Sequence, residues 1–581
     1  MCGIFAYLRN KQLYNHSIDE IKNGYLKGKD RGPEESNHFF DSNIFLGFHR
    51  LAINGLNKES SQPLKNDKIL LICNGEIYNY KQLTNKLKEN NPNFSLKTNS
   101  DCEIILYLYE QYGFETTLKL LDGVFGLVLY DFRNINTPQL FIARDPYGVR
   151  PLYQLTKNRN LVGVSSVMKM LSTQSIMKDN TYVVNQFTPG TYTKLNFSKN
   201  TNTWYMCYNK QYTMMPFAKE YNAMTTIDDF DFINIVKNTS AYYFKQIREH
   251  FIKGVEKRVT NSDRPIACLL SGGLDSSIVT SIVSKFYKEK NLGKLETYSI
   301  GIKGGEDLKY ARIVAEFLDT KHTEIELTEQ DFLNAIPEVI YAIESYDTTT
   351  VRASVGNYLI AKYISKHSNA KVIFNGDGSD ELMGGYLYFH NAPNSIEFDK
   401  ECRRLLSNIH YFDGLRSDRS ISCHGLEPRT PFLDRSWVQY YLSIPSEIRF
   451  HKYNKKCEKY LFRSAFDCKK NNKSIFLPDE ILWRTKEAFS DGVSKQTRSW
   501  YEIINEYVTT KLDNKTLSKI NKLPKLIHNN PETMEQKYYR VIFNSYFENC
   551  DNTIPYFWMP KYSNAKDSSA RTLKIYSEQN K

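Results

Sequence analysis

Between residues 265 and 374, short apolar runs alternate with longer amphipathic segments, and this alternation restricts the fold of the chain more than any other feature. Four runs have the length and residue types of strands: PIACLL (265–270), LETYSIGI (295–302), HTEIEL (322–327) and KVIF (371–374). Helical patterns over 276–289 and 307–318 separate the first three runs. Because strands joined by helical crossovers lie parallel in one sheet, we predict an α/β doubly wound domain, followed by a mostly helical C-terminal part.

The first 200 residues follow a different pattern. Strand-like runs separated by turns occur at IFLGFHRLAI (44–53), ILLICNGEI (69–77), GVFGLVLYD (123–131) and LFIARD (140–145). A helical pattern covers 100–113, where apolar residues recur three and four positions apart. This arrangement predicts layered α+β structure with antiparallel sheets.

The length of 581 residues also requires more than one domain, because single hydrophobic cores stop growing at about 250 to 300 residues. The periodic pattern is lost between 197 and 235, where Asn, Thr, Lys and scattered aromatic residues predominate. We therefore predict a first domain over 2–196, a connection over 197–235, a second domain over 236–565 and a tail over 566–581.

Composition excludes several classes of protein. Hydrophobic residues at 41% and charged residues at 24% are typical of globular chains, and no apolar run reaches the roughly 20 residues of a membrane span. The formal charge of +12 is spread among acidic residues, so we expect no nucleic-acid partner. Without a basic and apolar leader, and with ten cysteines that form no CxxC pair, the chain is expected to be cytoplasmic with reduced thiols.

A loop suited to phosphate follows the first strand of the parallel sheet. SGGLDSS (271–277) leads directly into a helix, so its glycines, hydroxyls and helix N-terminus can all face an anion. A structural turn is the alternative, because junctions between strands and helices are often rich in Gly and Ser. Asp275 favours the phosphate interpretation, since a carboxylate beside bound phosphates needs a metal ion.

A second loop, NGDGSDE (375–381), also follows a predicted buried strand. In a parallel sheet both loops would face one crevice beyond the carboxyl ends of the strands. Asp275 and Asp380 could then share Mg²⁺ that bridges phosphate oxygens. The two loops together predict chemistry on a nucleoside triphosphate.

These loops occur among further motifs that identify a family. SGGLDSS is similar to the pyrophosphate loop of the ATP pyrophosphatases, and nearly the whole chain resembles the glutamine-hydrolysing asparagine synthetases. The other motifs that carry this resemblance are MCGIFAY (1–7), RGPEES (31–36), HRLAI (49–53), NGEIYNY (74–80), RDPYGVRPLY (144–153), IESYDTTTVRAS (343–354), GDGSDE (376–381), GGYLYFHNAPN (384–394), EPRTPFLD (427–434) and LWRTKEAFSDGV (482–493). The resemblance implies an α+β N-terminal-nucleophile glutaminase domain with αββα layers, followed by an α/β doubly wound ATP-pyrophosphatase domain with a helical C-terminal part.

Cys2 would become the first residue of the chain if Met1 were removed. Its own α-amino group, with a pKa of about 7.7 to 8.0, would then be near enough to take the thiol proton. The opening of the chain therefore resembles that of the N-terminal-nucleophile glutaminases. A buried structural cysteine is the alternative.

The resemblance also implies a glutamine pocket. Arg50 would hold the α-carboxylate of glutamine, while Glu76 and Asp101 would receive its α-ammonium. The Asn74 side chain and the Gly75 N–H would stabilise the oxyanion that forms when Cys2 attacks. The remaining predicted glutamine-binding residues are Leu51, Ala52, Ile53 and Asn54. Taken singly, Arg50 could be a surface ion-pair residue and Asn74 a turn residue.

In the second domain the resemblance implies a site for ATP and aspartate. The predicted ATP-binding residues are Leu270, Ser271, Gly272, Gly273, Asp275, Ser276, Ser277, Ile300, Asn375 and Gly376. Asp377 and Lys486 would act in catalysis, and Tyr346 and Arg352 would bind aspartate. Core packing is the alternative for Tyr346, and an exposed helix lysine is the alternative for Lys486.

The implied reaction converts glutamine, aspartate and ATP into asparagine, glutamate, AMP and pyrophosphate through β-aspartyl-AMP, with Mg²⁺ as cofactor. The family usually has SGEGSDE where this chain has NGDGSDE, so Asn375 replaces Ser and Asp377 replaces Glu. A misplacement of about 1 Å can lower a rate by up to roughly 100-fold, which bears on efficiency more than on reaction type. Two alternatives are a β-lactam-forming synthetase, which would have no use for Cys2, and a non-catalytic regulatory protein. A homodimer is a family expectation.

Overall fold

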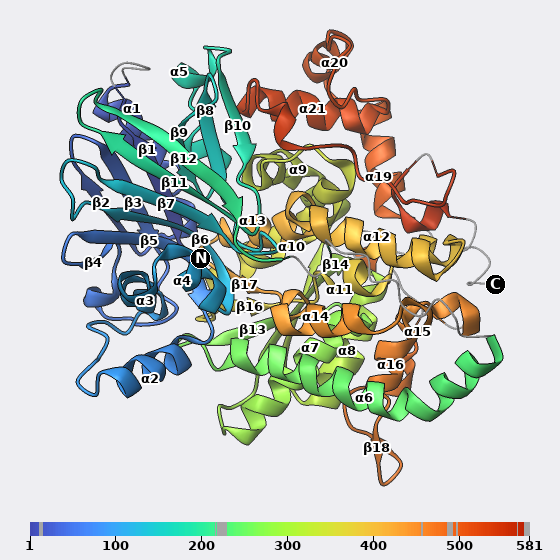
Figure 1. Ribbon diagram of the computed structural model, residues 1–581. Helices are drawn as coiled ribbons and strands as arrows, with labels where there is room; N and C mark the ends of the chain where they lie inside the picture. Colours follow the sequence, from blue (N-terminus) through green and yellow to red (C-terminus); the bar gives the residue numbers. More distant parts are fainter. Residues whose placement is uncertain are drawn as a thin grey trace.

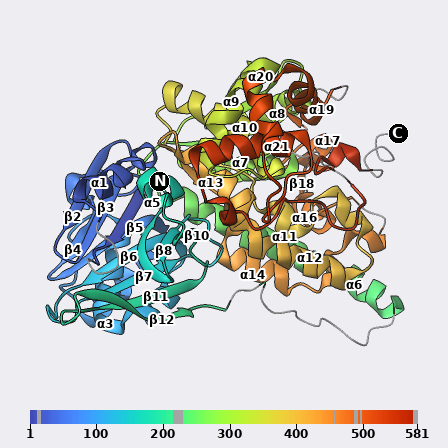
Figure 2. The same cartoon turned by 90° about the horizontal axis from the view of Figure 1, so that it is seen from above.

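The computed structural model describes residues 1–10, 16–214, 217, 229–454, 457–484, 492–494, 498–565 and 567–573. The chain forms an N-terminal part with two antiparallel sheets and a C-terminal part built around a parallel sheet, and the two parts lie side by side (Figures 1 and 2). This agrees with the change of pattern in the sequence.

Each sheet of the N-terminal part has six strands. The strand order of the first sheet is β10 (Tyr182–Gln186), β8 (Tyr153–Lys157), β9 (Asn160–Ser165), β1 (Gly3–Leu8), β3 (Ile44–Arg50) and β2 (Glu35–Phe40). The order of the second sheet is β12 (Thr203–Gln211), β11 (Thr191–Ser198), β7 (Gln139–Arg144), β6 (Gly123–Asp131), β5 (Ile69–Ile77) and β4 (Leu64–Asn66). Neighbouring strands are antiparallel throughout both sheets, as predicted.

The two sheets pack face to face. Alternate residues of β1, such as Ile4 and Ala6, meet Ile72 and Val128 of the second sheet in one buried cluster. Helix α1 (Ile18–Leu26) covers the outer face of the first sheet. The outer face of the second sheet packs against α2 (Tyr80–Asn90), α3 (Ile104–Tyr112) and α4 (Phe114–Leu120). The layers are therefore helix, sheet, sheet and helix, in agreement with the αββα expectation.

The antiparallel structure continues beyond the predicted boundary at residue 196. Strand β12 lies inside the segment that we expected to be a connection, and it pairs with β11 along its length. It is an edge strand, and most of its side chains are exposed on both faces. Because β12 buries only Trp204, its sequence lacks the alternation of apolar and polar residues that predicts a strand.

The C-terminal part contains five parallel strands. Their order is β15 (Lys321–Leu327), β14 (Glu296–Ile302), β13 (Ile266–Leu269), β16 (Val372–Phe374) and β17 (Glu427–Arg429). The chain runs outward from β13 to one edge and then returns to β16, so the direction of winding reverses between β13 and β16. Ligands of doubly wound sheets bind at such a reversal.

Helices surround this sheet, as the sequence predicts. The helices that follow the first strands are α7 (Leu274–Glu289) and α8 (Glu306–Leu318). The longer helices of the remainder are α6 (Asp229–Val259), α9 (Glu329–Ile343), α10 (Thr348–His367), α12 (Ser395–Asn408), α13 (Asp413–Ser422), α14 (Arg435–Ser443) and α21 (Met534–Tyr546). The shorter ones include α11 (Ser379–Met383), α16 (Tyr460–Phe466), α19 (Trp500–Glu506) and α20 (Asn514–Asn521).

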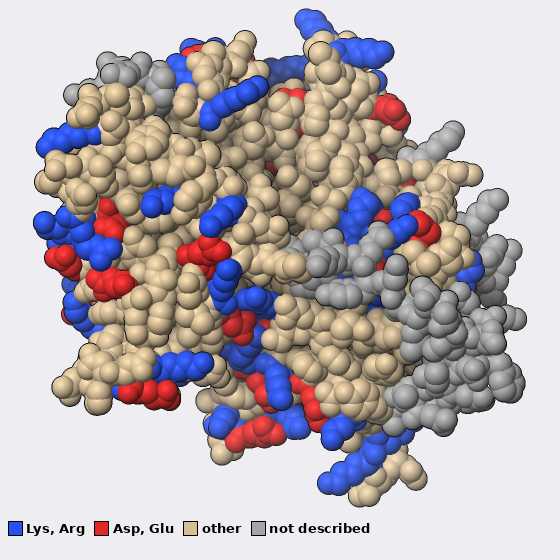
Figure 3. All heavy atoms as spheres, viewed as in Figure 1, with Lys and Arg blue, Asp and Glu red and all other residues tan. Residues whose placement is uncertain are grey.

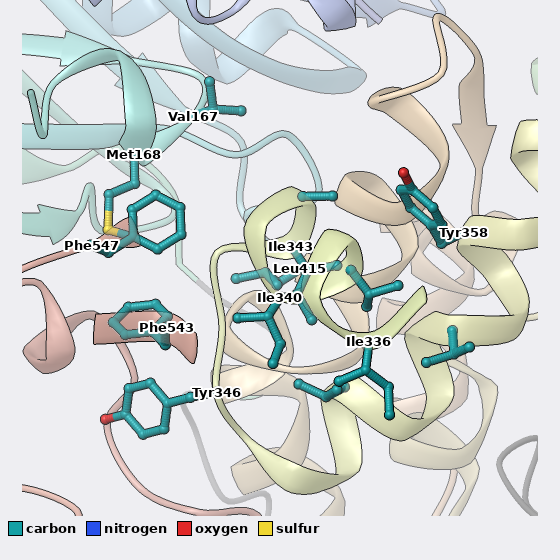
Figure 4. Packing of buried hydrophobic residues seen from close by; sticks show 14 of the residues in the cluster. Val167, Met168, Ile336, Ile340, Ile343, Tyr346, Tyr358, Leu415, Phe543 and Phe547 are labelled. Carbon is teal, nitrogen blue, oxygen red and sulfur yellow. The ribbon is translucent and has the colours of Figure 1, made fainter. Parts of the chain in front are cut away.

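The two parts share a hydrophobic core. Val167 and Met168 of the N-terminal part lie in the same buried cluster as Ile340 of α9 and Phe547 beyond α21 (Figure 4). Buried apolar contact of this kind holds the two parts in a fixed relation. None of the described helices is long and apolar enough to cross a membrane. On the face shown in Figure 3, basic side chains lie among acidic ones.

Candidate active sites

The first candidate site lies between the two antiparallel sheets. Cys2 directly precedes β1 and has the same strand parity as Ile4 and Ala6, so its side chain packs against the core between the sheets. Asn74 and Glu76 of β5 have the same parity as Ile72 and lie on the facing side. The sequence period therefore brings the thiol and these two polar residues into the space between the sheets.

The Asn74 side chain is buried, with 1% of its surface exposed, and neither its Nδ2 nor its Oδ1 has a hydrogen-bond partner among the described residues. An unsatisfied buried polar group costs about 1–3 kcal/mol, so such groups are retained mainly where a ligand completes them. Gly75 lies next to it, and a Cβ there would lie 2.5 Å from the Val124 carbonyl oxygen. The strand therefore presents an unpaired amide next to a position that only glycine can occupy.

Cys2 carries a partly buried thiol. Its Sγ donates to the Leu51 carbonyl oxygen at 3.6 Å, and burial raises its pKa to about 11. Met1 is also buried, and its amino nitrogen lies 3.6 Å from Oε2 of Glu427. Burial lowers the pKa of this amino group. A thiol with a raised pKa needs a nearby base for activation, and the nearest amino group belongs to the chain terminus.

The three predicted glutamine-binding charges are each held by hydrogen bonds. Arg50 Nη2 donates to the carbonyl oxygens of Gly55 and Asn57, both at 2.7 Å, which orders its guanidinium. Asp101 accepts from the Ile77 N–H at 2.6 Å, and burial raises its pKa to about 6. Glu76 accepts from Asn54 Nδ2 at 2.5 Å, and burial, followed by the neighbouring charges of Glu427 and Asp101, raises its pKa. The role of each residue in binding glutamine stays a prediction.

The loop after β3 contains the remaining predicted residues, Leu51, Ala52 and Ile53, and all three are buried. Residues of the C-terminal part hold this loop. Arg264 Nε donates to the Ala52 carbonyl oxygen at 2.8 Å, and the Asp263 N–H donates to the Ile53 carbonyl oxygen at 3.0 Å. The shape of the loop therefore depends on both parts of the chain.

The second candidate site is a cavity of about 160 Å³ at the carboxyl ends of β13, β14 and β16. Most of the predicted ATP, metal and catalytic residues line it: Leu270, Ser271, Gly273, Asp275, Ser276, Ile300, Asn375, Gly376, Asp377 and Asp380. The structure thus confirms that the two loops share one crevice. Gly272 and Ser277 do not line the cavity. Gly272 has a φ of +71°, and a Cβ there would lie 2.4 Å from the Ala311 nitrogen.

Asp275 and Asp380 both contact one cation, the ammonium group of a lysine that was not predicted from the sequence. The buried Lys459 Nζ lies 2.7 Å from Asp275 Oδ2 and 2.5 Å from Asp380 Oδ1. The same nitrogen donates to Ser379 Oγ at 2.6 Å. Lys459 stands just before α16, in a segment without a motif. No local signal could have identified it, because the contact depends on chain segments more than 75 residues apart.

Two carboxylates that meet at one point beside a phosphate loop also fit Mg²⁺, which prefers oxygen ligands and binds through one or two carboxylates together with phosphate oxygens. The described residues contain no cluster of three or more His, Cys, Asp and Glu side chains that could hold a metal ion by themselves. A metal at this point would therefore need oxygens from a ligand or from water.

One end of the cavity is rich in carboxylates. Arg416 Nη2 contacts Asp377 Oδ1 at 2.8 Å and Asp413 Oδ1 at 2.6 Å. Tyr386 donates to Glu381 Oε1 at 2.6 Å. Burial and the charge of Asp413 raise the pKa of Glu381, whereas Arg416 keeps the pKa of Asp413 low although burial opposes this. Glu381, Asp413 and Arg416 were not predicted from the sequence.

Tyr346 and Arg352 do not reach the cavity, contrary to their predicted role in binding aspartate. Tyr346 lies next to Phe543 (Figure 4). Their ring centroids are 5.0 Å apart, and the Tyr346 hydroxyl donates to the Asp551 carbonyl oxygen at 2.8 Å. Arg352 pairs with Glu535 at 2.5 Å and with Asp567 at 2.8 Å. Another face of α10 lines the cavity, through Thr349, Ala353 and Asn357. Lys486 lies outside the described residues.

Comparisons with known proteins agree with the two-part architecture. Residues 1–216 match the family described as "Glutamine amidotransferase domain", and residues 246–400 and 393–530 match "Asparagine synthase". The chain is 39% identical over 586 residues to "Asparagine synthetase [glutamine-hydrolyzing]" of Gallus gallus, covering 99% of each chain. The protein of the same name from Homo sapiens is 38% identical over 582 residues, again with 99% of each chain covered. An NMN synthetase structure from Francisella tularensis covers 35% of this chain and 95% of its own at 15% identity, with a TM-score of 0.18.

Proposed function

The chain belongs to the family of glutamine-hydrolysing asparagine synthetases, and from this premise we propose that its two sites perform the two halves of one reaction. The N-terminal site hydrolyses glutamine to glutamate and ammonia. The C-terminal site joins the β-carboxylate of aspartate to the α-phosphate of ATP and releases pyrophosphate. Ammonia then displaces AMP from β-aspartyl-AMP, which gives asparagine.

We propose that glutamine hydrolysis begins with Cys2 after Met1 has been removed. The free α-amino group of Cys2 takes the thiol proton, and Sγ attacks the side-chain amide of glutamine. The C–N bond then breaks and ammonia leaves with the proton that the amino group returns, and water hydrolyses the glutamyl thioester to glutamate and the free thiol. The Asn74 side chain and the Gly75 N–H stabilise the oxyanion, a role supported by the unpaired Asn74 amide. Arg50 holds the α-carboxylate, and Glu76 and Asp101 receive the α-ammonium.

In the C-terminal site the loop 271–277 cradles the β- and γ-phosphates at the N-terminus of α7. Leu270, Ile300, Asn375 and Gly376 line the part of the cavity assigned to adenosine. Mg²⁺ would be held by Asp275 and Asp380, where it would neutralise phosphate charge. Lys459 supplies a further positive charge at the same point, and Lys486 is proposed to contact the α-phosphate. In-line transfer needs mainly positioning and neutralisation of charge.

We place aspartate at the carboxylate-rich end of the cavity. The α-ammonium of aspartate would be received by Glu381 and Asp413, and Arg416 would face an aspartate carboxylate. This assignment replaces the one predicted for Tyr346 and Arg352. Asp377 lies at the same end, and its contact with Arg416 fixes the shorter carboxylate in one position.

The observation that carries the proposal is the pairing of the two motif loops around one cavity in a chain that matches these synthetases over 99% of its length. Adenylation is tested with aspartate labelled with ¹⁸O in its β-carboxylate. Because one carboxylate oxygen bonds to the α-phosphorus and leaves with AMP, we expect ¹⁸O in the AMP that is released. Formation of ADP, or of unlabelled AMP alongside new asparagine, would exclude the adenylate route.

A further inference from the structure

We propose that Arg429, a residue of the synthetase part, is a positioning residue for glutamine in the other part. This inference rests on the proposed glutaminase function. It concerns how Glu76, the acid proposed to receive the α-ammonium of glutamine, is held in place. Arg429 is the last residue of β17, the edge strand of the parallel sheet, yet its side chain extends to Glu76 on β5 of the second antiparallel sheet. The glutamine site is therefore completed by a strand of the other part.

The contacts of Arg429 fix its guanidinium completely. Its Nε lies 2.6 Å from Oε1 of Glu427, and its Nη1 donates to the Arg258 carbonyl oxygen at 2.8 Å. Its Nη2 donates to the Asn261 carbonyl oxygen at 3.0 Å and lies 3.3 Å from Oε2 of Glu76. The side chain has no exposed surface. A planar donor group held on three sides can adopt only one orientation, and this orientation keeps Nη2 within ion-pair distance of Glu76.

Glu76 depends on this partner because it is buried among other acids. The charged groups that face it are Asp101 and Glu427, which are acidic, and Arg429 and Arg150, which are basic. Burial and the two acids raise the pKa of Glu76, and Arg429 opposes them. Asn261 supplies a neutral donor, with Nδ2 at 2.8 Å from Oε2 of Glu76. Arg429 thus favours the ionised form of Glu76, which is the form that attracts an ammonium group.

The same residue also holds the ATP cavity. Its carbonyl oxygen accepts from the N–H of Asn375 at 3.2 Å, and Asn375 lines the cavity. Asn375 directly follows β16, whose Phe374 pairs with Arg429 in the parallel sheet. One residue therefore contacts the glutamine-binding acid through its side chain and the nucleotide loop through its backbone.

The test compares Arg429→Gln with a matched control, Arg419→Gln. Arg419 is likewise a buried arginine of the synthetase part, and it donates to the Ser166 carbonyl oxygen of the N-terminal part, away from Glu76. We expect Arg429→Gln to raise the glutaminase KM for glutamine by about tenfold or more while kcat changes by less than about threefold, since a charge-assisted contact to the binding acid is lost. Because Glu76 would be protonated more readily without Arg429, glutamine binding should begin to weaken at a higher pH in this variant. Arg419→Gln should leave both quantities unchanged.

Ammonia-dependent asparagine synthesis by each variant shows whether the protein has folded. Should Arg429→Gln fail to fold, Asn261→Ala removes one of the two neutral donors to Glu76 and should raise the KM for glutamine about threefold. An unchanged KM in both folded variants, or an equal increase in Arg419→Gln, overturns the role of Arg429. Absence of glutaminase activity in the unaltered protein would instead contradict the proposed function.

Discussion

Lys459 lies between Asp275 and Asp380, with its ammonium nitrogen 2.7 Å from the first carboxylate and 2.5 Å from the second. All three side chains line the cavity at the carboxyl ends of the parallel strands. Two acids this close would repel each other without a cation. The lysine therefore keeps the proposed metal ligands together, and it stands where phosphate charge would have to be neutralised.

Replacement of Lys459 tests this arrangement. Lys459→Met leaves two buried acids without their cation, and breaking such a buried pair costs about 3–5 kcal/mol. We expect a lower melting temperature that Mg²⁺ restores more strongly in the variant than in the unaltered protein, together with a loss of pyrophosphate release of about 100-fold or more. Lys452→Met, whose Nζ contacts only the Ala392 carbonyl oxygen among the described contacts, is the control. A variant that Mg²⁺ does not stabilise would contradict the metal assignment.

Replacement of Cys2 separates the two halves of the reaction. Cys2→Ala removes the nucleophile, so glutamine should no longer support asparagine synthesis, whereas ammonium should support it at close to the unaltered rate. Both activities are measured as asparagine formed per minute. Cys207→Ala, which changes an exposed cysteine, should alter neither. Loss of the ammonium-dependent activity in Cys2→Ala would show that the sites are not separate.

The Asn74 side chain is expected to lower the free energy of unfolding and, at the same time, to raise the glutaminase kcat. Because its buried amide has no partner among the described residues, Asn74→Ala should leave the free energy of unfolding unchanged or raise it by about 1–3 kcal/mol. The same change should lower the glutaminase kcat by about 100- to 1,000-fold, as expected for the loss of an oxyanion donor. Chemical denaturation and a glutamate assay measure the two effects. A destabilised variant with normal kcat would mean that the amide has a structural partner.

Two variants distinguish between the aspartate ligand predicted from the sequence, Tyr346, and the one proposed from the structure, Asp413. Tyr346→Phe removes two hydrogen bonds, the one that its hydroxyl donates to the Asp551 carbonyl oxygen and the one that it accepts from Asn529 Nδ2, and should cost about 1–3 kcal/mol of stability without changing the KM for aspartate. Asp413→Asn removes a proposed ligand of the α-ammonium and should raise this KM by about tenfold or more. Steady-state kinetics with ammonium as the nitrogen source compares them. A raised KM for aspartate in Tyr346→Phe, with an unchanged KM in Asp413→Asn, would show that Tyr346 binds aspartate.

The interface between the two parts should weaken in acid. Although burial opposes it, Arg429, Arg150 and the chain terminus hold the pKa of Glu427 at about 2, below its ordinary value of 4.5. A depressed pKa contributes stability that is present above the ordinary value and is lost as pH falls towards about 2. We therefore expect the free energy of unfolding to fall between about pH 5 and pH 3, and to fall less steeply in Glu427→Gln. Equal slopes would show that Glu427 does not titrate with unfolding.

Sequence patterns predicted the parts of the fold that repeat locally. The strands β13, β14 and β16 were found because buried parallel strands are apolar runs between helices; the edge strand β15 was also found, although only one of its residues is buried. β17 has only three residues and no such run, and β12 is exposed on both faces. The order of the strands around β13 depends on how the whole sheet assembles, so the sequence of a single strand does not indicate it.

The candidate sites were predicted where a motif lies on one loop. Both phosphate-side loops line the cavity as expected, because each directly follows a strand that ends there. Lys459, Arg416 and Arg429 were missed, since each acts on residues distant in the chain. Arg352 does not line the cavity, and because the first half of α10 is almost entirely buried, the sequence gives no amphipathic pattern that shows which face meets the cavity.

We propose, above all, that nitrogen released from glutamine in the N-terminal part is captured by an aspartyl adenylate in the C-terminal part. The most direct test supplies glutamine labelled with ¹⁵N in its amide, together with aspartate, ATP and Mg²⁺, and measures the mass of the asparagine side chain. We expect asparagine that carries ¹⁵N in its amide, formed with equal amounts of AMP and pyrophosphate. Unlabelled asparagine, or label that remains only in free ammonium while AMP and pyrophosphate accumulate, would contradict this proposal.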